Sequence, residues 1–310
     1  MSRSKLFILV LLSIIVFAML TLTSCDSINY VNNEHQIDVD FNNIAINTDT
    51  ADISFALSSD DICMVACYES VNERHVVEVV DDTLVVKATE DKNWDDFINF
   101  SFTSPKITVY LPKTSYASLI VRQSTGDVEI SKDLTFYNMD ISLSTGDVKC
   151  YASAVESIKI ESSTGDVSVQ GISTSSIDIA VTTGKVTVLD AICSGQVAIS
   201  VSTGKANVAD VVCKNLFSTG STGDIKLKNV VCSQNIFIKR NTGDVFMEDS
   251  DATELFISTS TGDVKGNLLT SKIFYAQSDT GRINVPKSVT GGLCEITTDT
   301  GDISITVSGD

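Results

Sequence analysis

The residues of this chain that could do chemistry recur in a fixed phrase, Ser-Thr-Gly-Asp-Val and close variants, which starts at Ser124. The residue after the glycine is acidic in seven of ten copies, at Asp127, Asp147, Asp166, Asp224, Asp244, Asp263 and Asp302. It is basic in the other three, at Lys185, Lys205 and Arg282. If the copies stack in space, the carboxylates form a row, and such a row of oxygen ligands could hold weakly bound Ca²⁺.

Physical limits on this row favour a simpler role. Carboxylates stacked about 4.8 Å apart repel each other by roughly 3 to 4 kcal/mol at an effective dielectric constant of about 20. The phrase also lacks the glycine-rich, aspartate-containing nonapeptide of calcium-binding rolls. We favour a solvated turn in which each Asp bonds to nearby backbone groups and the three bases relieve the repulsion. Calcium sites are the alternative, and no metal or cofactor is predicted.

Seven cysteines follow Cys25, at Cys63, Cys67, Cys150, Cys193, Cys213, Cys232 and Cys294. Cys193, Cys213 and Cys232 each lie nine residues after a repeat glycine, so we expect them to stack in one ladder. A Cα separation of about 4.8 Å lies within the range that a disulfide accepts. One of the three would still stay free, and buried thiols are the favoured interpretation. The spacing of a whole coil, with no histidine nearby, argues against zinc.

Residues for catalysis are scarce. Only two histidines occur, His35 and His75, so a Ser-His-Asp or Cys-His arrangement has no complete set of candidates. The Asp row is monotonous and lacks the differences in environment that separate an acid from a base. One aromatic cluster is evident, where packing in a cap is favoured over sugar stacking, at Trp94, Phe97, Phe100 and Phe102. We predict that the chain is not an enzyme.

The repeat predicts the elements that position these residues. Its ten glycines are spaced by 19 or 20 residues, at Gly126, Gly146, Gly165, Gly184, Gly204, Gly223, Gly243, Gly262, Gly281 and Gly301. A period this short indicates one supersecondary unit per copy, stacked on its neighbours. Thr precedes every glycine. Thr-Gly is typical of a corner, because glycine permits a positive φ and hydroxyl side chains bond to the backbone of turns.

Each copy has the pattern of strands. Val167-Ser168-Val169 follows a glycine, and Ile177-Asp178-Ile179 follows about ten residues later, both with a period of two. The sequence therefore predicts an all-β fold, a parallel β-solenoid (β-helix) of about ten regular 19–20-residue coils, each with two strands of about five residues. A short third side stays open, because apolar residues occur near the middle turn at Leu134, Val155, Ile172 and Val212.

The rest of the chain divides around this array. The regular repeats occupy 124–310, and 37–123 continues the strand pattern without a strict period. We predict that 37–123 forms irregular coils that cap the stack, because an open solenoid end exposes unpaired strand edges. The far end, which finishes with Ile303-Ser304-Ile305-Thr306-Val307, shows no evident cap.

The first 25 residues have the pattern of an export signal. Arg3 and Lys5 precede a nearly uncharged apolar run, and Leu22-Thr23-Ser24-Cys25 resembles the bacterial lipobox, which implies a lipid on Cys25. An uncleaved transmembrane helix is the alternative. Residues 26–36 are predicted to be a tether. Removal of the signal leaves 22 − 2 = 20 Lys and Arg against 40 Asp and Glu, a net charge of −20 that should repel nucleic acid and anionic lipid.

Beyond the corners, two further segments carry a family resemblance: Asp82-Thr83-Leu84-Val85-Val86 leading to Asn93-Trp94, and Ile107-Thr108-Val109-Tyr110-Leu111-Pro112-Lys113. Over about residues 37–310 the sequence resembles the bacterial "putative adhesin" domains of unknown function, some of which occur with envelope-stress operons. The resemblance implies a non-catalytic cell-envelope solenoid with an adhesive or scaffolding role. The alternatives are a polysaccharide-binding or polysaccharide-degrading β-helix and an envelope-stress-associated accessory protein. The expected partners are the membrane, through the lipid, and a surface glycan or envelope protein.

Overall fold

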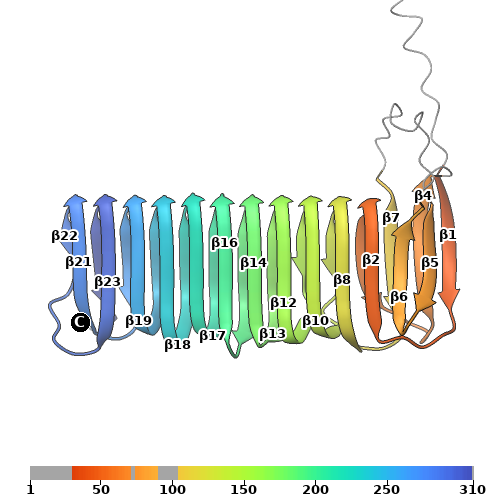
Figure 1. Ribbon diagram of the computed structural model, residues 1–310. Coiled ribbons are helices and arrows are strands. Elements are labelled where there is room, and N and C mark those ends of the chain that lie inside the picture. Colours follow the sequence, from red (N-terminus) through yellow and green to blue (C-terminus); the bar gives the residue numbers. More distant parts are fainter. Residues whose placement is uncertain (1–29, 71–73, 90–103, 309–310) are drawn as a thin grey trace, which may run out of the picture.

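The computed structural model describes residues 30–70, 74–89 and 104–308, and in these ranges every regular element is a β-strand (Figure 1). The strands wind as one parallel β-solenoid, which confirms the predicted fold class. No helix that could span a bilayer occurs in those three ranges. The predicted export signal, Cys25 and the aromatic cluster from Trp94 to Phe102 fall outside them.

One wall, called here the front wall, faces the viewer in Figure 1. Its strands run toward the Thr-Gly corner and pair in parallel at equal repeat positions, such as Ile141 with Ile160. They run on to the Thr before the glycine, because the alternation of β-branched and polar residues extends that far, and so they are longer than the five residues predicted. They are β8 (Ser115–Thr125), β10 (Thr135–Thr145), β12 (Ser153–Thr164), β14 (Ser176–Thr183) and β16 (Gln196–Thr203).

After each corner glycine the chain turns onto the back wall. The first four back-wall strands are β9 (Val128–Ile130), β11 (Val148–Cys150), β13 (Val167–Thr174) and β15 (Val186–Cys193). Three longer strands then run without a break from the back wall round to the front wall: β17 (Ala206–Thr222), β18 (Ile225–Thr242) and β19 (Val245–Thr261). Inward side chains of both walls, such as Ile160 and Val169, are fully buried and form one core along the stack.

The coils have three sides. A second column of positive-φ residues lies six positions after the corner glycine, at Gly171, Asp190, Asp210, Asn229 and Asp249. Beyond it the chain forms a short side with its own pairing, in which Ile172 pairs with Ala191. The third side left open by the sequence therefore exists. Of its apolar candidates, Leu134 and Ile172 are buried, whereas Val155 and Val212 are 55% and 56% exposed.

The N-terminal end of the stack mixes parallel and antiparallel pairing. The coil of β2 (Asn43–Thr50) and β3 (Asp52–Leu57) lies beside β8 and β9. Next to it come β6 (Thr83–Ala88) and β7 (Lys106–Leu111). Beyond them, β5 (His75–Val80) and β4 (Cys63–Ser70) are antiparallel to β6 and β7. The irregular region thus closes the stack with strands that do not follow the coil direction.

The predicted tether is wrong from Tyr30 onward. Residues Tyr30–Ile37 form β1, which pairs with β4 along its whole length, from Tyr30 with Ser70 to Ile37 with Cys63. The asparagines that suggested a tether are compatible with this strand, because every second side chain faces solvent and Asn33 donates to Glu69 on β4. Asparagine is rare in strands, and for this reason the sequence favoured a tether over a strand.

At the C-terminal end the order in space differs from the order in the chain. The last strands are β20 (Val264–Leu268), β21 (Lys272–Thr280), β22 (Ile283–Asn284), β23 (Gly292–Thr300) and β24 (Ile303–Val307). β23 lies between β19 and β21 (Figure 1), and β24 pairs with β20 on one side and β22 on the other. The final coil takes the inner place because its inward residues, such as Ile296 and Ile303, are apolar and fully buried.

Candidate binding surfaces

The ten repeat glycines form one column at the upper edge of the stack (Figure 1). Nine of them have φ between 124° and 155°. A Cβ added to Gly146 would overlap the carbonyl oxygen of Gly126, and the same overlap with the neighbouring corner recurs along the column, where Ala51 takes the first place. Glycine is therefore required twice, by backbone conformation and by the close approach of the adjacent coil.

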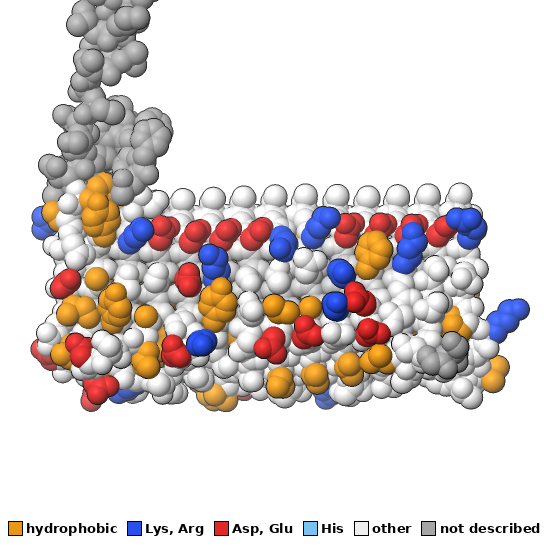
Figure 2. Space-filling view, turned by 180° about the vertical axis from the view of Figure 1, so that it is seen from behind, with side chains coloured by type: hydrophobic (Ala, Val, Ile, Leu, Met, Phe, Trp, Pro, Cys, Tyr) orange, Lys and Arg blue, Asp and Glu red, His pale blue; other side chains and the backbone are white. Residues whose placement is uncertain are grey.

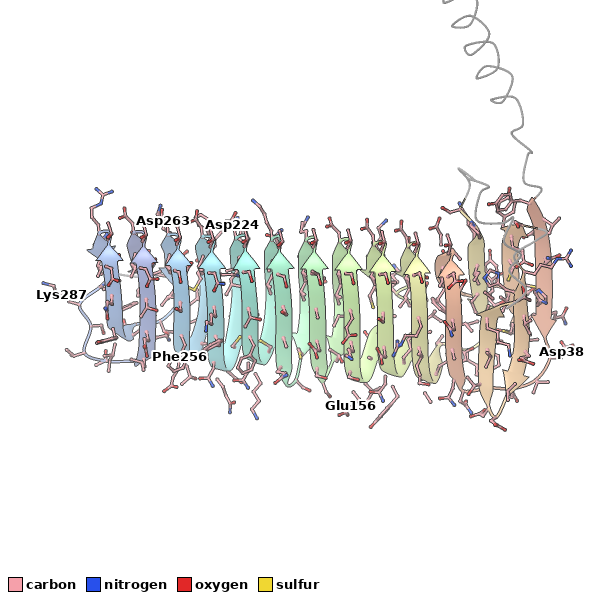
Figure 3. All side chains as sticks on the ribbon, turned by 45° about the horizontal axis from the view of Figure 1, so that its top comes forward. Asp38, Glu156, Asp224, Phe256, Asp263 and Lys287 are labelled. Carbon is pink, nitrogen blue, oxygen red and sulfur yellow. The ribbon has the colours of Figure 1, made fainter. Side chains whose placement is uncertain are left out.

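The acidic row lies directly beside this column. Seen from behind in Figure 2, it forms an upper edge of red and blue side chains, and Figure 3 labels two of its members, Asp224 and Asp263. Oδ1 of each Asp accepts a hydrogen bond from the backbone N–H of the corresponding residue in the next coil. Asp127 accepts from Asp147 at 2.8 Å, and Asp147 accepts from Asp166 at 2.7 Å. Each carboxylate thus bonds to backbone, as in the favoured interpretation, and calcium binding stays the alternative.

The interleaved C-terminal coil changes the charge order of the row. In space the acids form two blocks of four, Asp52 with Asp127, Asp147 and Asp166, and Asp224 with Asp244, Asp263 and Asp302. Lys185 and Lys205 separate the blocks, and Arg282 ends the row beside Asp302. In the chain Arg282 comes between Asp263 and Asp302, whereas in space it lies beyond Asp302.

Three carboxyls in the second block have pKa values below the usual range for aspartate. A hydrogen bond from Lys205 Nζ, 3.1 Å from Oδ2, is the main cause of the lowered pKa of Asp224. Lys265 Nζ, 2.5 Å from Oδ2, lowers the pKa of Asp263. The backbone N–H and the guanidinium of Arg282 lower the pKa of Asp302. These bonds stabilise the charged form and offset part of the repulsion along the row.

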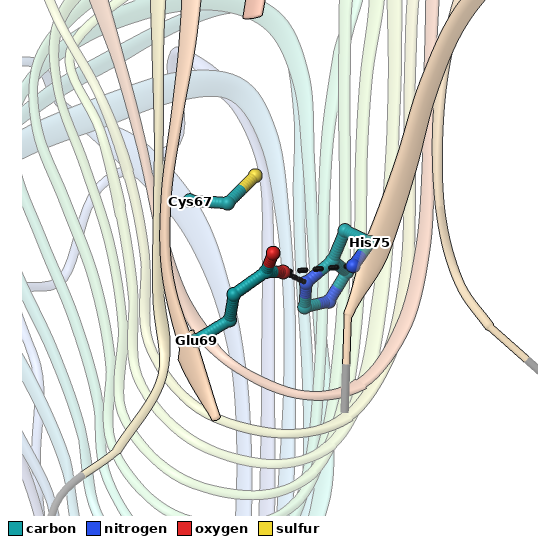
Figure 4. A group of neighbouring side chains, drawn as sticks. All are labelled: Cys67, Glu69 and His75. Atoms are coloured by element: carbon teal, nitrogen blue, oxygen red, sulfur yellow. Dashed lines mark hydrogen bonds and ion pairs between the residues drawn. The ribbon is translucent and has the colours of Figure 1, made fainter. Parts of the chain in front are cut away.

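A second polar group is buried at the N-terminal end, where Cys67 and Glu69 of β4 meet His75 of β5 (Figure 4). The atoms of these three side chains that could bind a metal ion lie within 4.8 Å of one another. Glu69 Oε2 accepts hydrogen bonds from N and from Nδ1 of His75, both at 2.7 Å, and His75 Nε2 lies 2.9 Å from Thr48 Oγ1. Burial, with Glu69 nearby, raises the pKa of Cys67 to about 12. Since the carboxylate and both ring nitrogens have protein partners, the group is best explained as a buried hydrogen-bond network that joins β4, β5 and β2.

A row of phenylalanines on the front wall was missed in the sequence, where Trp94 to Phe102 was taken as the one aromatic cluster. Phe217, Phe237 and Phe256 pair in register on three successive coils. All three are at least partly exposed, and Figure 3 shows Phe256 pointing away from the stack. The rings of Phe217 and Phe237 have centroids 6.3 Å apart. Their position six residues before Gly223, Gly243 and Gly262 was the available signal.

Polar rows flank this aromatic row on both sides. Two residues earlier on each strand stand Asn215, Asn235 and Glu254, and two residues later stand Thr219, Lys239 and Ser258. Asn235 donates to Asn215 Oδ1 through its backbone N at 3.2 Å, so the amide column is held in register. The result is a repeating surface in which a column of aromatic rings lies between two columns of hydrogen-bonding groups.

A parallel stack with one glycine corner per coil defines a β-solenoid repeat domain. The chain belongs to the Toastrack DUF4097 family, whose model matches residues 41–200 and 190–310. This match confirms the family resemblance that the repeats indicate. No curated protein matches the sequence.

Solved structures share the fold at low sequence identity. A "putative lipid binding protein" from Parabacteroides distasonis is 16% identical, with a TM-score of 0.50, over 77% of this chain and 97% of that chain. A "putative adhesin" from Bacteroides fragilis is 15% identical, with a TM-score of 0.45, over 91% and 98%. Another "putative adhesin", from Parabacteroides merdae, is 11% identical, with a TM-score of 0.41, over 89% and 96%. At these identities the likeness shows the fold alone.

Proposed function

We propose that this chain is a non-catalytic cell-envelope protein that binds a surface polysaccharide along its front wall. The observation that carries the proposal is the in-register row of Phe217, Phe237 and Phe256 between two polar rows. Aromatic faces offer apolar contact to the faces of sugar rings, and the adjacent amides, hydroxyls and Lys239 can bond to sugar hydroxyls. A repeating surface suits a repeating polymer, because each of the three coils offers one aromatic ring between two polar side chains.

The arrangement of the acids supports binding over turnover. Glycoside hydrolysis uses two carboxyl groups that face each other across the scissile bond and differ in pKa. The acids of the described row instead lie side by side on one edge, each bonded to the backbone of its neighbour. Binding without chemistry is the role that this geometry favours.

The proposal includes export and a lipid on Cys25. Because β1 starts at Tyr30, the chain from Cys25 to Tyr30 reaches at most about 18 Å when fully extended. Such a short link would keep the N-terminal end of the stack close to the bilayer. The net charge of −20 on the rest would be repelled by anionic lipid, which favours a stack that projects outward with its front wall accessible.

An array of glycans and matrix proteins, probed with the soluble fragment 26–310 with and without Ca²⁺, tests this function. We expect retention on at least one polymeric glycan, without product formation, in both conditions. Substitution of the central ring, Phe237→Ala, should weaken that binding at least tenfold, which corresponds to about 1.4 kcal/mol.

Phe246→Ala is the matched control, because Phe246 is 38% exposed, close to the 37% of Phe217. It lies at the start of β19 on the back wall, the side of the stack that Figure 2 shows, and so away from the proposed site. Equal binding by the Phe237→Ala and wild-type chains would contradict the front-wall site. Cleavage of a bound polysaccharide would favour the degradative alternative, and binding only to matrix proteins a protein adhesin. A strict need for Ca²⁺ would shift the site to the acidic row.

A further inference from the structure

Three cysteines stack on the inner face of the short side, in the order expected from their spacing. Cys213 pairs in register with Cys232, and the pairing of Ile192 with Val212 places Cys193 on the coil before them. All three are nearly fully buried. Thr174 precedes them in the column and Ala252 follows, so the ladder has two ends of different chemistry.

The thiols are not equivalent. Cys213 Sγ and Cys232 Sγ lie 2.9 Å apart and point at each other. Cys193 Sγ turns to backbone carbonyl oxygens instead, that of Ser175 at 3.3 Å and that of Gln196 at 3.2 Å. In-register neighbours about 4.8 Å apart at Cα fall in the range that disulfides adopt. The contacts thus select one pair of the three.

A cavity gives this pair a route to solvent. It has a volume of about 430 Å³ and is lined by Cys232, Ala252, Leu269 and Lys272, among others. The cavity lies where β20 ends at Leu268 and the chain crosses to β21, two coils away in space. In the described pairings, Ala252 therefore has no strand partner on the side away from Cys232. Cys232 is the only member of the ladder among the residues that line this cavity.

From this geometry we infer that Cys213 and Cys232 form a disulfide by exchange with a low-molecular-weight disulfide, and that Cys193 stays a thiol. The hydrogen bond with Cys213 and burial raise the pKa of Cys232, so only a small fraction is thiolate at any time and the exchange is slow. That Cys232 thiolate attacks one sulfur of the reagent, whose S–S bond breaks and releases one thiolate. The Cys213 thiolate then attacks the Cys232 sulfur and expels the second thiolate. Two protein thiols are oxidised, the reagent is reduced to two thiols, and the two protons pass to the released thiolates.

Peptide mapping of the full chain tests the inference directly. The chain is kept with oxidised glutathione, or refolded with it, then unfolded, alkylated and digested with trypsin. Cleavage after Lys205, Lys214, Lys228 and Lys239 puts Cys213 in peptide 206–214 and Cys232 in peptide 229–239. We expect these two peptides to be joined, two hydrogen masses below the sum of the reduced peptides. Cys193, in peptide 186–205, should be alkylated.

Two variants separate the possibilities. Cys193→Ala should keep the linked pair, whereas Cys213→Ala should leave Cys232 joined to glutathione. The oxidised wild-type chain should also unfold at a higher urea concentration than the reduced chain, and Cys213→Ala should lose that shift. A link between peptides 186–205 and 206–214, or full alkylation of Cys213 and Cys232 after both treatments, would overturn the inference.

Discussion

The guanidinium of Arg240 occupies the space where a side chain at Gly220 would begin, because a Cβ added to Gly220 would overlap Arg240 Nη1. The two residues are in-register neighbours in an inward column of the front wall. Arg240 is 1% exposed and donates from Nη2 to Ser218 Oγ at 2.8 Å. Burial lowers the pKa of Arg240 to about 10, although Asp224 opposes the shift. One bulky cation is thus accommodated inside the stack by the loss of a side chain on the adjacent coil.

This relationship predicts energetic coupling between the two positions. Gly220→Ala should destabilise the chain by about 1 to 3 kcal/mol, because the new methyl group overpacks the space of the guanidinium. In an Arg240→Thr background, which copies Thr259 at the next coil, we expect that cost to fall by about 1 kcal/mol. Urea unfolding of the two single variants and the double variant measures the coupling. Strictly additive effects would show that the two side chains do not compete for space.

The corner glycines and the glycine of the second column should respond differently to substitution. Gly184→Ala meets both a φ of 151° and the carbonyl oxygen of Gly165, so we expect a loss of at least about 3 kcal/mol. Gly171→Asn should change stability by less than about 1 kcal/mol. Its added Cβ has open space, and Asn229 adopts the same conformation at the equivalent position. Thermal unfolding of both variants checks the contrast, and similar losses would contradict it.

The second acidic block should make the fold sensitive to acid. Asp224, Asp263 and Asp302 have lowered pKa values in the folded chain, so their contribution to stability is present above the unfolded value of about 3.9. It is lost as the pH falls through the lower folded pKa values. The midpoint temperature of thermal unfolding, measured at a series of pH values from 7 to 2.5, should therefore fall once the pH is below about 4. Asp263→Asn should unfold at a lower temperature than wild type at pH 7. At pH 2.5 the difference between the two unfolding temperatures should be smaller. A constant difference would contradict this linkage.

Four other thiols should be unreactive in the folded chain. Burial raises the pKa of Cys63 to about 11 and the pKa values of Cys67, Cys150 and Cys294 to about 12. Because the thiolate is the reactive form, alkylation at pH 8 should be at least about 100-fold slower in the folded state than in urea. Time-resolved labelling followed by peptide mapping measures each site. Labelling of Cys150 at the unfolded rate would show that its coil opens readily.

The repeat in the sequence was sufficient to predict the coil stack, because the Thr-Gly corners mark one position in every turn and Val and Ile alternate on either side. It could not reveal that Gly301 lies between Gly262 and Gly281, because all three corners share the Thr-Gly pair and nothing in their local sequence fixes the order in which their coils stack. β1 was missed because its polar residues resemble a linker. Gly220 and Arg240 each lie three residues before a corner glycine, so the repeat predicts that they are neighbours, but it does not report that the guanidinium is buried over Gly220.

The placement of β23 and β24 affects how the chain would respond to force. In a simple repeat stack the last coil has one neighbour, so a pull on the chain end peels it away alone. Here the terminal strands each have a partner on both sides, so extraction must break two ladders at once while β21 and β22 remain as an outer brace. A force applied to the carboxyl end would therefore have to rupture two hydrogen-bond ladders together, which needs more force than the one-by-one peeling of a terminal coil with a single neighbour.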